Sequence, residues 1–327
     1  MVFEFTVQPN FNFVTSFAEA FKIPVFKNKL VIPSYMGEGY IKKIDVEPGL
    51  KFVLHHYTLQ QDFHLRRLAS EEANDLVSIV FNSTEIPTDT TVENLHNNQY
   101  AKPDGSAIQI ASSSLGTETF FPAKSEIYFA VVGIKPQLLS SLLSIEKNNK
   151  LVSTILCQGA RFFYHESMTP DFQRILKQLT EINDEDKLSH LFYKIKVLEL
   201  LYLLFGRLIN RDNAHHSPVN KADLDKVYLL RKAIMDDLSV PPRLDDLATK
   251  AGMSETKMKQ LFKQTFGDTI YNYYQKLRME EAAFLITKAG HSVSEAGYTL
   301  GFSNLSHFSR LFEKHYGLTP KKFTLAG

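Results

Sequence analysis

Cysteine is nearly absent from this sequence of 327 residues, which contains only Cys157. A single thiol forms no internal disulfide and does not supply the several cysteines of a structural zinc site. This scarcity is typical of a reducing compartment, and we expect a cytoplasmic protein with no metal and no other cofactor. Cys157 lies in the apolar stretch ILCQGARFF, which favours a buried and inert side chain over the alternative, an oxidant-sensing thiol.

Long hydrophobic runs and targeting signals are also lacking. The start, MVFEFTVQPNFNF, does not show the basic segment and apolar core of a signal peptide. The most apolar window, residues 197–205, contains Glu199 and is far shorter than the roughly 20 apolar residues that cross a bilayer. The sequence therefore predicts no transmembrane segment.

Complete catalytic motifs are missing from residues 1–220. No Ser-His-Asp set, paired carboxylates or phosphate-binding loop can be assembled there, and GEGY at 37–40 lacks the third glycine of a dinucleotide site. His55, His56 and His64 resemble part of a cupin-type metal site. However, His55 and His56 are consecutive, so in a strand they point to opposite faces, and no glutamate follows at the usual cupin spacing. We therefore predict neither catalytic nor metal-binding residues.

Two kinds of pattern are present, joined by a polar stretch. Residues 1–168 hold short segments rich in Val, Ile, Phe, Tyr and Thr, punctuated by Gly, Pro, Asn and Asp, and they predict a β-rich barrel or sandwich with a sensory role. Residues 169–212 begin with Thr-Pro, a helix-start signal, and predict a helical pair. Residues 213–222 have no periodicity and form the expected linker. Residues 223–327 are predicted to be a separate helical domain.

Charge is balanced overall but unevenly distributed. The formal net charge is +1, yet 16 basic against 12 acidic residues give +4 for residues 221–327, and 21 against 24 give −3 for residues 1–220. This asymmetry weakly favours an anionic partner for the C-terminal part.

The longest predicted helix, residues 185–211, carries two apolar stripes. The first contains Leu188, Leu191, Ile195, Leu198, Tyr202, Phe205 and Ile209, and the second contains Val197, Leu201, Leu204 and Leu208. Two apolar faces need two partners. We expect one face to cover the sheet or the preceding helix, and the other to pair with the same helix of a second chain, as heptad seams do, giving a homodimer. The alternative is one wide core face inside a monomer.

An internal repeat occupies much of the C-terminal part. Residues 244–269 parallel residues 293–319, with matching glycines at 252 and 301, matching Leu-Phe pairs at 261 and 311, and matching glycines at 267 and 317. Each copy predicts a short helix, a glycine turn and a second helix beginning near Ser254 or Ser303. This is the outline of a helix-turn-helix.

In each copy the second predicted helix buries one side and exposes a polar side. Lysine and arginine suit guanine or phosphate, glutamine suits adenine, and serine or threonine suits either. We therefore predict a DNA-binding surface that includes Thr256, Lys259, Gln260, Lys263, Ser306, Ser309 and Arg310. Residues 269–289 between the copies span about 30 Å if helical, close to one turn of B-DNA, roughly 34 Å, so both helices could enter successive major-groove segments.

Residues 276–323 resemble the signature of the AraC/XylS family of bacterial transcriptional regulators. The matching positions are Arg278, Ala282 and the Leu-Ile pair at 285, then Gly301-Phe302, Phe-Ser-Arg-Leu-Phe at 308–312, and Gly-Leu-Thr-Pro at 317–320. The resemblance covers about residues 221–325, a third of the chain. One departure is Gly297, which stands where alanine is usual.

This resemblance implies an α+β multidomain regulator. The expected architecture is an N-terminal β-rich, cupin-like barrel or sandwich with a helical dimerisation segment, followed by an all-α domain of seven helices with two helix-turn-helix motifs. Base or phosphate contacts carry over to Thr256, Lys259 and Gln260 in the first recognition helix and to Leu305, Ser306 and Arg310 in the second.

The resemblance also implies the partners. It points to double-stranded promoter or operator DNA, a second copy of the chain, and a small-molecule effector bound in the barrel, with RNA polymerase as a further candidate partner. The alternative is a metal-dependent barrel enzyme fused to a DNA-binding domain.

Overall fold

The computed structural model describes residues 1–8, 11–69, 76–84, 107–112, 115–144, 150–157, 162–210, 221–287 and 289–326. The chain divides into two compact units, Met1–Lys221 and Ala222–Gly327, and each unit has hydrophobic cores of its own. Of the predicted linker, residues 213–220 lie outside the described residues.

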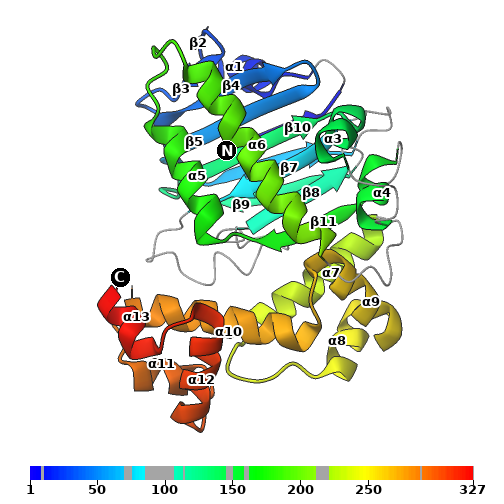
Figure 1. Cartoon of the computed structure of the whole chain (residues 1–327), viewed down its shortest axis with the longest axis vertical. Coiled ribbons are helices and arrows are strands. Elements are labelled where there is room, and N and C mark those ends of the chain that lie inside the picture. Colours follow the sequence, from blue (N-terminus) through cyan, green and yellow to red (C-terminus); the bar gives the residue numbers. More distant parts are fainter. Residues whose placement is uncertain are drawn as a thin grey trace. The chain divides into compact units, whose positions relative to one another are not determined.

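The first unit is built on an eight-stranded sheet (Figure 1). Its strands lie in the order β11-β8-β7-β10-β5-β4-β3-β2, and all neighbours are antiparallel. Their bounds are β2 (Val25–Phe26), β3 (Lys29–Val31), β4 (Gly37–Glu47), β5 (Leu50–Leu59), β7 (Val77–Asn82), β8 (Ala107–Ser112), β10 (Glu126–Ile134) and β11 (Phe163–Ser167).

Of the predicted alternatives, a barrel or a sandwich, the barrel is wrong. Among the described strands the large sheet is open, with β11 at one edge and β2 at the other, and a separate three-stranded sheet has the order β1-β6-β9. The bounds of these strands are β1 (Val2–Thr6), β6 (Phe63–Leu68) and β9 (Thr117–Phe121). Other elements cover both faces of the large sheet, so its strands bury apolar residues on both sides without closing on themselves.

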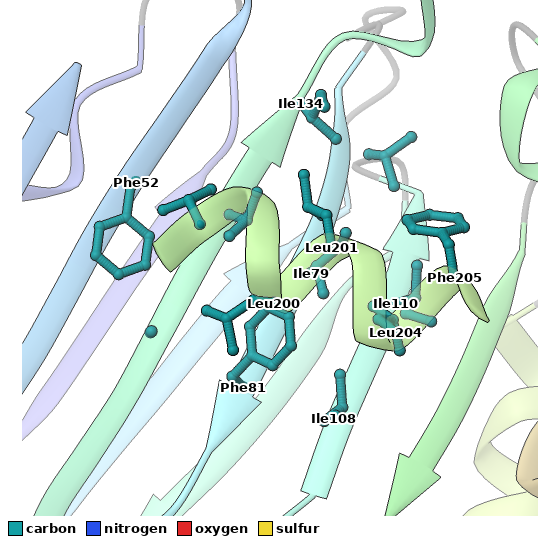
Figure 2. Packing of buried hydrophobic residues seen from close by; sticks show 14 of the residues in the cluster. Phe52, Ile79, Phe81, Ile108, Ile110, Ile134, Leu200, Leu201, Leu204 and Phe205 are labelled. Carbon is teal, nitrogen blue, oxygen red and sulfur yellow. The ribbon is translucent and has the colours of Figure 1, made fainter. Parts of the chain in front are cut away.

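One face of the large sheet packs against α3 (Pro136–Leu143), α4 (Lys150–Leu156), α5 (Pro170–Glu181) and α6 (Ser189–Ile209). α5 and α6 lie across this face (Figure 1). Leu204 and Phe205 of α6 pack in this core with Ile110 of β8 (Figure 2). Phe205 therefore belongs to the stripe that covers the sheet, not to the first stripe, where its spacing placed it.

The opposite face packs against α1 (Phe13–Phe21) and the three-stranded sheet, in a second core rich in phenylalanine. The ring centroid of Phe3 lies 5.3 Å from that of Phe13 and 5.1 Å from that of Phe17. Asn12 caps α1, its side chain accepting a hydrogen bond of 3.2 Å from the Val14 N–H. The strand-like sequence pattern did not predict α1, α3 or α4.

Helices are the only regular secondary structure among the described residues of the second unit. Its helices are α7 (Lys221–Met235), α8 (Leu244–Ala251), α9 (Glu255–Phe266), α10 (Ile270–Thr287), α11 (Val293–Thr299), α12 (Leu305–Tyr316) and α13 (Pro320–Ala326). α7 to α10 contribute to one core and α10 to α13 to another, and Leu238 packs against both. The long helix α10 therefore connects the two cores.

The structure also bears on the thiol of Cys157 and on membrane-spanning helices. Cys157 is exposed, so the expectation of a buried thiol is wrong, because the chain has left α4 and its core one residue earlier, at Leu156. No described helix is both long enough and apolar enough to cross a membrane.

Candidate nucleic-acid interface

The first helix-turn-helix consists of α8, a turn at Gly252 and α9. Gly252 adopts a left-handed conformation with φ of 57° and ends α8, a conformation that glycine adopts without steric cost. The Ser254 side chain caps α9 by accepting a hydrogen bond of 3.4 Å from the Lys257 N–H. Met258 and Phe262 are fully buried, so α9 is anchored through one side only.

The second helix-turn-helix consists of α11, a turn at Gly301 and α12. Ser292 and Glu295 form a capping box at the start of α11. The side chain of Asn304 caps α12 by accepting hydrogen bonds from the backbone N–H groups of Ser306, at 2.9 Å, and His307, at 3.1 Å. The helix begins at Leu305, two residues after the predicted Ser303.

Gly301 is required in this turn for two reasons. Its φ is 74°, and a Cβ built on it would lie 2.0 Å from the carbonyl oxygen of Ser239. Both the left-handed backbone and the close approach exclude a side chain. The turn is thereby held against the segment that precedes α8.

Arg278 of α10 holds the second motif from inside. Its guanidinium carbon lies 3.7 Å from the ring centroid of Phe302 and 5.1 Å from that of Tyr274, and Nη2 donates a hydrogen bond to the carbonyl of Leu300. The side chain is buried, and burial lowers the pKa of the guanidinium below its ordinary value. The sequence identified Arg278 only as part of the family signature, and the structure supplies its contacts.

The residues predicted to contact DNA lie on the outer sides of α9 and α12. Thr256, Lys259, Gln260 and Lys263 are exposed on α9. On α12, Ser306 and Arg310 are exposed, whereas Leu305 and Ser309 are half-buried. Their contacts with DNA remain predictions.

Leu305 has a packing role in addition to its predicted one. It packs against the core formed by α10 to α13, and a Cβ built on Gly297 would lie 2.6 Å from its Cδ2 atom. The glycine at 297, which departs from the family pattern, thus leaves room for the leucine at 305.

Ion pairs distinguish the two helices. On α9 the Lys259 ammonium lies 2.6 Å from the Glu255 carboxylate, and Lys257 lies 2.7 Å from Asp223 of α7. On α12 the Arg310 Nε donates a long hydrogen bond of 3.4 Å to the backbone carbonyl of Ser306. Two cations of α9 are therefore already paired with carboxylates inside the unit.

The three histidines of the first unit occupy different surroundings. His55 is buried, with its ring stacked on that of Phe129 at a centroid distance of 3.9 Å and edge-on to that of Phe13 at 4.6 Å. His56 lies 3.4 Å from Glu126, and His64 of β6 lies 3.6 Å from Glu118. Among the described residues no group of three or more His, Cys, Asp and Glu side chains is placed to hold a metal.

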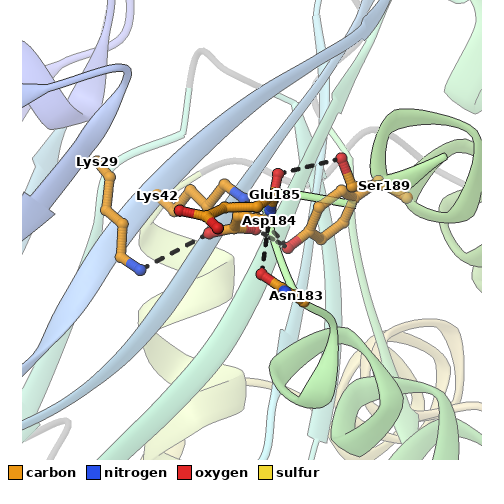
Figure 3. A network of polar contacts seen from close by, with 7 residues as sticks. Lys29, Lys42, Asn183, Asp184, Glu185 and Ser189 are labelled. Carbon is orange, nitrogen blue, oxygen red and sulfur yellow. Dashed lines mark hydrogen bonds and ion pairs between the residues drawn. The ribbon is translucent and has the colours of Figure 1, made fainter. Parts of the chain in front are cut away.

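A polar network that the sequence did not predict ties the turn between α5 and α6 to the large sheet (Figure 3). Lys42 donates to Asp184, Tyr193 donates to the same carboxylate at 3.0 Å, and Lys29 lies 3.7 Å from it. Burial raises the pKa of Asp184, but the hydrogen bond and charge of Lys42 outweigh it, and the pKa lies below its ordinary value. Burial, with the Asp184 charge, raises the pKa of Tyr193, so its hydroxyl remains a donor.

Comparison with known proteins adds to this geometry. Residues 37–221 match the family model of the regulatory protein PchR N-terminal domain, more than half of the chain, and residues 247–325 match a helix-turn-helix domain. The chain belongs to the AraC/XylS family of transcriptional regulators. Its N-terminal part is PchR-like, and its C-terminal part matches a helix-turn-helix domain.

The similar proteins match only part of this AraC/XylS-family chain. The HTH-type transcriptional activator RhaR of Yersinia pseudotuberculosis serotype O:1b (strain IP 31758) is 27% identical over 150 residues, 46% of this chain and 50% of RhaR. The probable transcription factor PqrA of Proteus vulgaris is 35% identical over 81 residues, 25% of this chain and 66% of PqrA. A solved AraC-type regulator from Chromobacterium violaceum is 28% identical, with 32% of this chain and 95% of that one covered and a TM-score of 0.30. The chain spans about half the length of the RhaR relative.

Proposed function

We propose that this regulator binds specific DNA sequences by inserting α9 and α12 into successive major-groove segments on one side of the duplex. The observation that carries the proposal is the repeated geometry: each helix buries its apolar side in its own core and exposes a polar side. Between the two motifs α10 has 18 residues, a length of about 27 Å. This length is near the roughly 34 Å of one turn of B-DNA.

A fragment of residues 221–327 tests the proposal. It contains both motifs, α10 and two cores, so we expect it to fold and to bind DNA with an affinity that falls steeply as salt rises, because phosphate contacts release counterions. The matched control is a fragment of residues 1–210, which is expected to bind no DNA. A folded 221–327 fragment without DNA binding at low salt would contradict the proposal.

The outer side of α6 supports a homodimer. Leu188, Leu191, Ile195 and Tyr202 are 65%, 52%, 51% and 76% exposed, and their spacing of three, four and seven residues follows a heptad seam. Contiguous apolar patches of this kind mark interaction surfaces. The inner side of the same helix is occupied by the sheet, so a second copy of α6 is the proposed partner of the outer side.

Glutamate substitutions separate this interface from the core. Leu191→Glu with Ile195→Glu is expected to give folded monomers in analytical ultracentrifugation, because these side chains lie outside the core. The control is Leu142→Glu, which changes a leucine that is 41% exposed on a different helix, α3, and should leave the dimer intact. A double variant that remains dimeric would rule out the α6 interface.

An effector site in the first unit is supported by two buried polar groups. The Nδ1 atom of His55 and the hydroxyl of Tyr57 have no hydrogen-bond partner among the described residues, although both side chains are buried and their ring centroids lie 6.0 Å apart. A buried polar atom without a partner costs about 1–3 kcal/mol. A small uncharged effector that hydrogen-bonds to this pair would remove that cost, and the aromatic surroundings disfavour a charged one.

Tyr57→Phe tests this site because it removes only the hydroxyl. Without a ligand the variant should be as stable as the wild type or more so, since an unpaired polar atom is lost, while stabilisation by any effector found in a thermal-shift screen should be lost. Tyr128→Phe is the control, since Tyr128 faces the other side of the sheet and donates to the Leu176 carbonyl. An effector that stabilises Tyr57→Phe as well as the wild type would place the site elsewhere.

Activation of transcription is a further part of the proposal. The RhaR relatives are described as transcriptional activators, and an activator of this kind would contact RNA polymerase. A reporter gene placed behind the site that the protein selects should be transcribed more strongly when the intact chain is present. Reduced transcription would instead identify a repressor.

A further inference from the structure

The side of α9 proposed to face DNA carries an acidic residue as well as basic ones. Glu255 is the first residue of α9, and its carboxylate lies 2.6 Å from the ammonium of Lys259, one turn later. The two side chains are 46% and 50% exposed. A carboxylate on this side is repelled by phosphate unless a base edge offers it a hydrogen-bond donor.

The edge of a G·C pair offers such a partner. In the major groove this pair presents the guanine N7 and O6 acceptors followed by the cytosine N4 donor. The Lys259 ammonium matches the two acceptors and the Glu255 carboxylate matches the donor. An A·T pair presents acceptor, donor and acceptor instead, followed by a methyl group. There the ammonium finds only one acceptor beside the donor that the carboxylate needs, whereas a G·C pair offers it two adjacent acceptors.

We propose that Glu255 and Lys259 act together to select a G·C base pair, with Glu255 accepting a hydrogen bond from the cytosine amino group. This inference rests on the proposed function, since it requires α9 to enter the major groove. The N-terminal residues of a recognition helix are those that contact base edges, and Glu255 and Lys259 occupy the first two turns of α9. At sites without this pair the carboxylate remains unmatched and weakens binding.

Glu255 has a second possible use, as a favourable charge at the N-terminus of α9. The recognition helix of the other copy forms without it, because the first turn of α12 contains no acidic residue and Asn304 supplies its cap. Helix stabilisation and base selection make different predictions. If Glu255 only stabilises the helix, its substitution changes the melting temperature and leaves the base preferences unchanged. If Glu255 selects a base pair, its substitution changes the base preferences.

The test uses the intact chain and a library of randomised DNA duplexes, from which bound sequences are selected and counted. The wild type is expected to enrich a site with a G·C pair in one orientation at the position facing the start of α9. Glu255→Gln should lose roughly 5- to 100-fold of the preference at that pair, keep the preferences at the other positions, and bind random duplexes more tightly. Lys259→Met should lose the preference at the same pair.

Glu313→Gln is the matched control, since it removes one carboxylate from the exposed surface of α12 and should leave every base preference unchanged. If Glu255→Gln selects the same sequences as the wild type at every position, the inference is overturned and Glu255 only stabilises its helix. If the wild type itself enriches no sequence, the proposed function fails and the inference fails with it.

Discussion

At the scale of single residues, His55 is expected to make the first unit acid-sensitive. Burial lowers the pKa of His55 to about 3 from its ordinary value of 6.5, so the unfolded chain takes up a proton in a pH range where the folded chain does not. The stability that His55 contributes is therefore complete above pH 6.5 and is lost progressively as the pH falls toward 3. At pH 5 the loss is roughly 2 kcal/mol.

His55→Phe is expected to remove this loss, measured by urea unfolding of the first unit at pH 7 and pH 5. The control is His56→Phe, since the neighbouring residue lies on the other face of the strand beside Glu126 and should leave the acid sensitivity in place. Equal loss of stability in the wild type and in His55→Phe would show that other groups cause the acid sensitivity.

Arg310 is predicted to select bases, whereas Lys321 and Lys322 of α13 are predicted to touch only phosphate. Arg310→Ala should cost about 1–3 kcal/mol on the selected site and relax the preference at one or two base pairs. Lys321→Ala with Lys322→Ala should weaken binding to all sequences about equally and flatten the salt dependence. Binding to the selected site, to its single-base variants and to random DNA over a salt series separates the two. If Arg310→Ala leaves the base preferences unchanged, Arg310 is a phosphate contact.

At the scale of elements, Arg278 is expected to hold α10 against the turn between α11 and α12. A charge-assisted hydrogen bond contributes about 1.5–3 kcal/mol and stacking of a cation on an aromatic ring about 0.5–2 kcal/mol. Arg278→Met should therefore destabilise the 221–327 fragment by roughly 2–4 kcal/mol in urea unfolding. Lys314→Met, at an exposed position of α12, should change stability by less than about 0.5 kcal/mol. An Arg278→Met fragment as stable as its parent would show that packing alone holds the second motif.

The elements also differ in how far the sequence predicts them. The helix-turn-helix motifs could be predicted because turn glycines, caps and apolar spacings are local, and the repeat presents each of them twice. The open sheet could not be predicted from the sequence. Whether strands close into a barrel depends on pairing between distant segments, such as the parallel pairing of β1 with β6. The assignment of Phe205 to one stripe of α6 also could not be predicted. It depends on where the sheet lies beside the helix, and the spacing of apolar residues along α6 does not give that position. The Asp184 network joins residues more than 140 positions apart, and no local pattern points to it.

At the scale of the whole molecule, a unit that is proposed to bind DNA follows a unit that is proposed to dimerise and to bind an effector. One chain is proposed to contact two successive major-groove segments through α9 and α12. Methylation interference on the selected site distinguishes this arrangement from others, because methylation of guanine N7 blocks contacts in the major groove. For each bound chain we predict two groups of interfering guanines whose centres lie about 10 base pairs apart on one side of the duplex. A single group per chain, or interference confined to the minor groove, would contradict this arrangement.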